Sequence, residues 1–241
     1  MNKSLENKIE SYFESTKRLS KHDFIGVILI DFPNWSNNTI NMYLSKLKKE
    51  GKINNPSRGI YELGSSKKFN PLINASLKKI FSKINKEYPF INCCIWNTIW
   101  LNDLMQHQPF KNYTVIEVDK EASEQVFNFL SNNYKNVFLN PDSDIFNLYI
   151  SALDEIIIIK NLISEAPIEK IDTIKIPTLE KLLVDMLIDE ELFAAQQGEI
   201  EFIFKTALSK YVLNKLQMKR YAMRRNREKE IENIINISLA K

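Results

Sequence analysis

The 241-residue sequence is poor in three residue types, with five glycines, two cysteines and two histidines. So few glycines leave no glycine-rich phosphate loop and no dinucleotide-binding fingerprint, which excludes both kinds of nucleotide site. The two cysteines, Cys93 and Cys94, are adjacent on what reads as a buried strand. Neighbouring strand residues point to opposite faces, so a disulfide between them is not expected. A reducing, cytoplasmic setting follows.

Long apolar runs and catalytic motifs are also missing. No run approaches the ~20 apolar residues of a membrane span, and the N-terminus reads as an amphipathic helix rather than a signal peptide. His22 and His107 lie in different expected domains, and neither has a nucleophile or carboxylate at a relay spacing. The cysteine pair has no second Cys or His pair at zinc spacing. We therefore expect no enzyme activity, no metal and no cofactor.

The net charge of +3 hides a strong asymmetry along the chain. Residues 1–68 carry 12 Lys and Arg against 7 Asp and Glu, and residues 205–241 carry 10 against 3. Residues 69–204 between them carry 11 Lys and Arg against 20 Asp and Glu. A basic N-terminal module is typical of nucleic-acid contact, whereas an acidic middle is expected to avoid phosphate.

Residues 23–63 are typical of a winged helix-turn-helix, with two helices, a tight turn and a β-hairpin. The second helix is expected over Asn37–Glu50, with Ser36 as N-cap and Gly51 as the stop. Its buried face has the helical spacing of Ile40, Tyr43, Leu44 and Leu47. Two short strands, Lys52–Asn54 and Ile60–Leu63, then surround a turn that carries Arg58.

The opposite face of this helix is a candidate DNA-reading surface. Asn bonds adenine bidentately, Met contacts a thymine methyl group, and Lys neutralises phosphate. The candidate DNA-binding residues are Asn38, Asn41, Met42, Ser45, Lys46, Lys49, Lys52 and the wing residue Arg58. The alternatives are a merely solvated helix face and a winged helix that docks another protein.

The predicted fold class is α+β or α/β: an N-terminal winged helix-turn-helix over residues 1–66, then a larger α/β domain over residues 70–241. A polar run before Asn70-Pro71 marks the boundary. Five short β-branched or aromatic runs predict a mixed sheet with helices between its strands: Phe90–Trp96, Tyr113–Val118, Asn136–Leu139, Glu155–Ile159 and Ile171–Ile176. From Thr178 onward the pattern is helical, with apolar stripes in 179–187, 202–216 and 218–235.

A basic run, Lys215–Lys229, lies in the last of these helices and contains a single acid. A face with Met218, Tyr221, Ala222 and Arg225 is expected to pack on the domain. The candidate partner or nucleic-acid surface consists of Lys219, Arg220, Arg224, Arg225 and Arg227. A solvated terminal helix, a second DNA contact and a cleft for an acidic partner are the alternatives.

An enzyme is the rival from another class. Glu117, Asp119 and Asp142 follow or end strands, and carboxylates at strand ends can hold Mg²⁺ for phosphodiester cleavage. Glu155 and Lys160 are five residues apart, so they lie on opposite strand faces and do not complete such a site. Charged strand ends without catalysis are the default interpretation.

Three segments carry a resemblance to a known family. They are WNTIWLNDLMQHQPFKNYTVIEVDKEASEQVF at Trp96–Phe127, IPTLEKLLVDMLID at Ile176–Asp189, and the closing KRYAMRRNREKEI at Lys219–Ile231. With the N-terminal winged helix, they make the sequence similar to the AbiEi-like antitoxins of type IV abortive-infection toxin–antitoxin systems over nearly the whole chain.

The resemblance implies an antiviral-defence regulator. It represses its own operon by binding repeated half-sites in promoter DNA, as a possible homodimer on DNA. It counters a co-encoded nucleotidyltransferase-like toxin through the larger domain, without requiring a stable complex. A stand-alone transcriptional regulator and an Mg²⁺-dependent nuclease with a winged-helix targeting module remain the alternatives.

Overall fold

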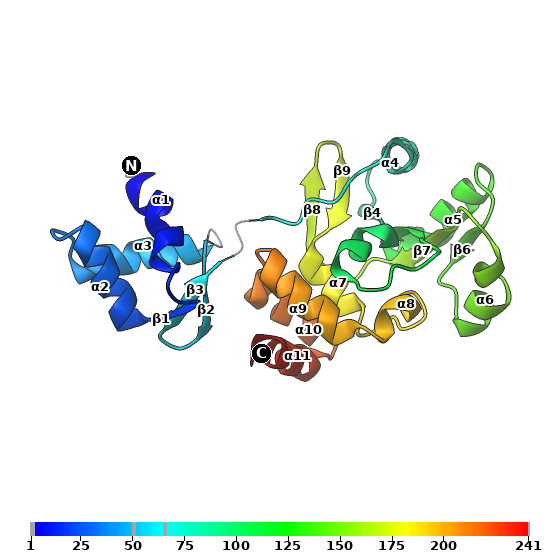
Figure 1. Cartoon of the computed structure of the whole chain (residues 1–241). Coiled ribbons are helices and arrows are strands. Elements are labelled where there is room, and N and C mark those ends of the chain that lie inside the picture. The colour runs from blue at the N-terminus through cyan, green and yellow to red at the C-terminus, as the bar shows by residue number, and fades with distance from the viewer. Residues whose placement is uncertain (1–2, 50–51, 65–66, 241) are drawn as a thin grey trace. The chain divides into compact units, whose positions relative to one another are not determined.

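A computed structural model describes residues 3–49, 52–64 and 67–240. The chain forms two compact units (Figure 1). The smaller unit contains Met1–Phe69 together with a short segment, Thr206–Leu213, from the C-terminal part of the chain. The larger unit contains Asn70–Lys205 and Asn214–Lys241. The fold is α+β with a mixed sheet and C-terminal helices, which confirms the predicted fold class.

Three helices and a small antiparallel sheet build the N-terminal part of the smaller unit. The helices are α1 (Lys3–Tyr12), α2 (Lys21–Asp31) and α3 (Asn37–Lys49), and the strands are β1 (Arg18–Ser20), β2 (Ile53–Ser57) and β3 (Ile60–Leu63). The strand order is β1-β3-β2. The helices bury one apolar core against the sheet, formed by Leu5, Ile9, Phe13, Phe24, Ile28, Ile40, Leu44, Leu47 and Ile53. This arrangement is compatible with a winged helix.

Side-chain caps fix where α2 and α3 begin. The Ser20 hydroxyl accepts a hydrogen bond from the Asp23 backbone N–H at 3.1 Å. The Ser36 hydroxyl accepts one from the Thr39 N–H, also at 3.1 Å. Each bond satisfies an N–H group that has no partner within its helix, so the predicted N-cap Ser36 is confirmed and Ser20 caps α2 in the same way. The predicted stop residue, Gly51, lies outside the described residues.

The hairpin after α3 differs from its prediction. The first strand extends to Ser57, so the turn contains Arg58 and Gly59 alone rather than five residues. Gly59 has φ +79°, a left-handed conformation that glycine adopts without strain. A bulge lies between Asn54 and Ser57, and the Asn55 side chain closes it by donating to the Ser57 and Ile60 carbonyls at 2.8 and 2.6 Å.

The larger unit is built on a four-stranded sheet of order β4-β5-β7-β6. Its strands are β4 (Cys93–Asn97), β5 (Thr114–Val118), β6 (Val137–Leu139) and β7 (Ile157–Asn161). β4 and β5 are antiparallel, whereas β5–β7 and β6–β7 are parallel. The sheet is therefore mixed, as predicted.

Both cysteines are buried and free on β4, as expected from their adjacency. Burial raises the pKa of the Cys93 thiol to about 12 and raises that of Cys94 well above its ordinary value. Such thiols stay protonated at neutral pH and are poor nucleophiles.

Helices and short 3₁₀ turns connect the strands. They are α4 (Ala75–Glu87), η1 (Thr98–Leu104), η2 (Lys120–Ala122), α5 (Ser123–Ser131), α6 (Ser143–Leu148) and η3 (Ile150–Ala152). The Asn74 side chain caps α4 and fixes where this helix begins. Leu72, just before the helix, is 86% exposed. Phe90, expected in the next strand, is 97% exposed.

The predicted single strand over Ile171–Ile176 is wrong. The chain instead forms a hairpin of β8 (Ile168–Ile171) and β9 (Ile174–Pro177). Asp172 turns the chain in the left-handed conformation at φ 52°, a geometry that Asp tolerates better than most residues. β9 packs against β4.

Five helices complete the chain: α7 (Leu179–Asp185), α8 (Ala194–Gln197), α9 (Ile200–Lys210), α10 (Lys215–Arg224) and α11 (Glu228–Ala240). The apolar stripes at 202–216 and 218–235 each predicted one helix, and both predictions are wrong. The first stripe breaks between α9 and α10, and the second breaks at Asn226, which has φ 57°. α10 packs against both α7 and α11. Among the described residues, no helix is long and apolar enough to span a membrane.

Candidate functional site

The outer face of α3 is the first candidate site. Ile40, Leu44 and Leu47 are buried. The candidate base readers Asn38, Asn41, Met42 and Ser45 are all exposed. The predicted division of this helix into a core face and a free face is therefore confirmed, while DNA contact by the free face stays a prediction.

The wing residue Arg58 is exposed at the two-residue turn of the hairpin. The turn is held by a hydrogen bond from the Lys21 backbone N–H to the Gly59 carbonyl at 2.6 Å. The start of α2 and the wing are thereby joined, so Arg58 projects from an anchored turn.

Two of the candidate DNA-binding lysines are engaged inside the unit. Lys46 lies 3.1 Å and Lys52 2.6 Å from the carboxylate of Glu6 on α1. The hydrogen bonds from Lys52 and Lys46 lower the pKa of Glu6. The interaction therefore stabilises the unit above the ordinary Glu pKa and is lost as the pH falls through the lowered one. The side chain of the third candidate, Lys49, is not among the described ones.

The basic C-terminal segment is less open than predicted. Lys219 pairs with Glu232 at 2.6 Å, and Arg227 pairs with Glu230 at 2.7 Å. Arg224 donates to both carboxylate oxygens of Glu165, through Nε at 2.9 Å and through Nη2. The acids that pair with Lys219, Arg224 and Arg227 therefore interrupt the predicted cationic surface. Arg220 is exposed.

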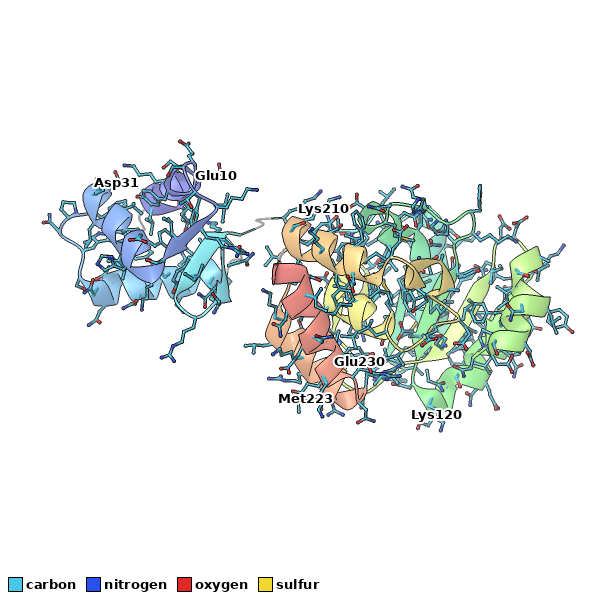
Figure 2. All side chains as sticks on the ribbon, turned by 60° about the horizontal axis from the view of Figure 1, so that its bottom comes forward. Glu10, Asp31, Lys120, Lys210, Met223 and Glu230 are labelled. Atoms are coloured by element: carbon cyan, nitrogen blue, oxygen red, sulfur yellow. The ribbon has the colours of Figure 1, made fainter. Side chains whose placement is uncertain are left out.

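The opposite face of α10 behaves as expected, because Met218, Tyr221 and Ala222 are buried. Met223 points outward at the edge of the larger unit (Figure 2) and is 57% exposed. Arg225 follows the helix and lines a hollow beside the sheet instead of joining an exposed cationic surface. This position sets Arg225 apart from the other four candidate cations.

The second candidate site is a charged centre buried beneath this hollow. The side chain of Lys181, on α7, is 1% exposed. Its ammonium donates to both oxygens of Glu117 at 2.7 and 2.6 Å and to Asp185 at 2.6 Å. The three contacts match the three N–H donors of a lysine, so Lys181 is fully satisfied. Together the three groups carry one net negative charge.

Two further side chains complete this charged centre. The Trp96 indole N–H donates to Glu117 at 2.9 Å, and the Tyr221 hydroxyl donates to Asp185 at 2.8 Å. Burial alone lowers the pKa of Lys181, but the carboxylates of Asp185 and Glu117 outweigh it and raise that pKa well above its ordinary value. Burial, followed by the charge of Asp185, raises the pKa of Tyr221. Lys181 is therefore a permanent cation and Tyr221 a permanent hydroxyl near neutral pH.

Strand register explains why these groups share one face of the sheet. Cys94 pairs with Glu117 across β4 and β5, and Glu117 pairs with Lys160 across β5 and β7. Paired residues of neighbouring strands point to the same side. That side faces α7 and carries the hollow, which has about 370 Å³ of empty space, partly open to solvent. Its polar lining consists of Glu117, Lys160, Asn161, Asp185, Asp189 and Arg225.

The carboxylates of the nuclease alternative do not come together. Glu117 is occupied by Lys181 and Trp96, Asp119 accepts from the Asn92 backbone N–H at 2.8 Å, and Asp142 caps α6. Across the ranges that the structure describes, no three His, Cys, Asp or Glu side chains form a group that could hold a metal ion. Of the two histidines, His22 is exposed beside Asp23, and His107 pairs with Glu199.

Sequence reasoning missed Lys181 and Asp185. The segment LEKLLVD reads as an apolar core helix, and every residue of α7 is in fact buried. The available signal was a Lys and an Asp four residues apart on a helix whose other positions are mostly apolar. Charged residues are almost never fully buried unless they are paired, so such a helix needs charge partners on the element against which it packs.

The fold and these two sites define a two-unit α+β protein, with a three-helix module bearing a β-hairpin and a larger unit centred on a buried ion triad. The chain belongs to the family described as "Family of unknown function (DUF6577)", whose model matches residues 39–241. A comparison with curated proteins found no match. The family description names no activity, so the similarity to AbiEi-like antitoxins stays a prediction.

Proposed function

We propose that this protein is a sequence-specific, non-enzymatic DNA-binding regulator that acts in the cytoplasm through its N-terminal unit. The observation that carries the proposal is the outer face of α3, where Asn38, Asn41, Met42 and Ser45 are exposed on a helix whose opposite face packs into the core. Arg58 at the tip of the hairpin supplies a cation suited to the phosphate backbone. A helix of this kind fits the major groove and presents its outer side chains to base edges.

The proposal is tested by gel shift against the DNA upstream of the protein's own gene. A specific complex is expected at moderate salt, with log affinity falling linearly with log salt. A single winged helix buries only about 600 to 1,000 Å² of protein surface, so two copies on repeated half-sites are expected. The absence of any shift would leave α3 as a solvated or protein-docking face.

A charge substitution on α1 gives a sharper test of the DNA surface. Glu6→Gln removes one negative charge from beside Lys46 and Lys52, so the affinity for all DNA should rise and the salt slope should steepen by up to about one unit. The control is Glu10→Gln, an exposed acid on the same helix (Figure 2) that changes the net charge equally. Equal effects of the two variants would show that these two lysines have no local role.

We further propose that the regulator is the antitoxin and autorepressor of a type IV abortive-infection system. The three segments similar to AbiEi-like antitoxins support this, and all three supply the charged centre: Trp96–Phe127 carries Trp96 and Glu117, Ile176–Asp189 carries Lys181 and Asp185, and Lys219–Ile231 carries Tyr221. In this proposal the larger unit counters a co-encoded nucleotidyltransferase-like toxin without needing a stable complex. Repression and toxin neutralisation are then separable activities.

Co-expression with the product of the neighbouring gene tests this second half. The full-length Asn38→Ala/Asn41→Ala variant should lose repression yet still rescue growth from the toxin, because both changes lie on exposed positions of the smaller unit. A neighbouring gene that is harmless when expressed alone, or a wild-type chain that gives no rescue, would contradict the antitoxin role and leave a stand-alone regulator.

A further inference from the structure

The hollow beside the charged centre contains two polar groups with unmet bonding capacity. Arg225 is half-buried and lines the hollow, yet its guanidinium has no hydrogen bond or ion pair within the described part of the chain. The Oδ1 atom of Asn161, at the end of β7, is buried there without a hydrogen-bond partner. An unpaired buried donor or acceptor is costly, so each group calls for a partner.

The other charged groups of the hollow already have partners. Lys181 and two donor side chains satisfy Glu117 and Asp185, and Lys160 pairs with Asp189. These carboxylates therefore do not leave free oxygens to bind a cation. Arg225 is the cation left to attract an anion, with Lys160 beside it in the lining.

We infer that this hollow binds a small organic phosphate that also carries hydroxyl or amino donors. A phosphate monoester is an anion at neutral pH, which suits the unpaired Arg225, and the fork of an arginine binds its oxygens bidentately. Asn161 Oδ1 requires a donor from the same ligand, such as a sugar hydroxyl or a base amino group. Only about 50 Å³ of the hollow is enclosed enough to hold a ligand, far below the usual size of a ligand site, so the phosphate group binds inside and the rest of a nucleoside monophosphate or sugar phosphate extends toward solvent.

The site is pre-organised by the charged centre beneath it. Glu117 on β5, Asp185 on α7 and Tyr221 on α10 are tied through Lys181 and each other, which fixes three elements around the hollow. Ligand binding then needs little rearrangement of the backbone. The inference does not depend on DNA binding, which belongs to the other unit.

Calorimetric titration of the full-length protein with adenosine 5′-monophosphate tests the inference, with ribose 5-phosphate, adenosine and inorganic phosphate as separate arms. The monophosphate is expected to bind, and adenosine to bind at least about tenfold more weakly. Ribose 5-phosphate binding as tightly as the monophosphate would assign the site to sugar phosphates. Absence of binding by all three phosphate compounds would overturn the inference.

Variants locate the bound probe. Arg225→Gln should weaken phosphate binding at least about tenfold, whereas Arg220→Gln, an exposed position on α10 outside the lining, should leave it unchanged. Asn161→Asp keeps the size of the side chain but adds a negative charge, so it should also weaken binding.

Adenosine 5′-monophosphate should shift the Trp96 indole N–H resonance, because Trp96 lines the hollow. The assignment would be contradicted by an unmoved Trp96 resonance or by a folded Arg225→Gln protein that binds as tightly as the wild type. If Arg225→Gln does not fold, the affinity of Asn161→Asp and the Trp96 resonance test the assignment.

Discussion

Replacing Lys181 by methionine is expected to lower the free energy of unfolding of the larger unit by about 3 to 5 kcal/mol. The substitution leaves Glu117 and Asp185 buried without their shared cation, and two like charges then face each other in the interior. Methionine fills a similar volume, so the loss reports charge rather than packing. Urea unfolding followed by circular dichroism measures the effect.

Two further variants separate a specific charge effect from a general loss of lysine. Lys78→Met breaks the exposed pair with Asp172, at 3.0 Å, and should cost less than about 1 kcal/mol. The triple variant Glu117→Gln/Lys181→Met/Asp185→Asn removes all three charges together and should recover much of the stability lost by Lys181→Met. A Lys181→Met protein as stable as the wild type would show that the triad is hydrated and contributes little.

Replacing Asn38 and Asn41 together by alanine is expected to abolish specific DNA recognition while leaving the fold intact. Each asparagine that reads a base contributes about 1 to 3 kcal/mol of discrimination. Loss of both asparagines should therefore reduce operator affinity by roughly several hundred-fold. Binding to unrelated DNA should stay almost unchanged, because neither residue carries charge. Competition gel shifts with operator and unrelated DNA measure the specificity ratio.

A matched control is Asn147→Ala, an exposed asparagine on α6 in the other unit, which should not alter DNA binding. Thermal unfolding should differ little among the three proteins, since exposed substitutions usually change stability by less than about 0.5 kcal/mol. If the double variant retains the full specificity ratio, α3 is not the base-reading helix.

The helices of the smaller unit were predictable because local rules govern them. Apolar spacing located α1, α2 and α3, and Ser20 and Ser36 marked the starts of two of them. The strand β1 was missed because three residues carry almost no periodic pattern, and its pairing with β3 depends on residues over 40 positions away. The open face of α3 followed directly from knowing its buried face.

The larger unit was less predictable, because its turns lack the usual signals. Asp172 and Asn226 reverse or break the chain at positive φ. The residues that usually mark a turn or a helix break in a sequence are glycine and proline, and neither position carries one. The hollow depends on long-range register, which aligns Glu117 with Lys160 across two parallel strands. Arg225 was predicted on the face of the helix that packs on the domain, but the hollow that it lines is formed by other elements and could not be inferred from that helix.

The triad has a consequence for the order of events during synthesis. The ribosome adds Glu117 to the chain long before it adds Lys181 and Tyr221. Glu117 is buried only when Lys181 lies beside it, and Asp185 also accepts a hydrogen bond from Tyr221. A nascent chain that ends before α7 holds a carboxylate that must stay in water, so the sheet cannot close on that side. Contacts of such sequence separation slow folding, and a collapsed chain that lacks them exposes apolar strands. The larger unit should therefore become protease-resistant only after α10 has left the ribosome, which makes the last fifth of the chain the switch for completing the fold.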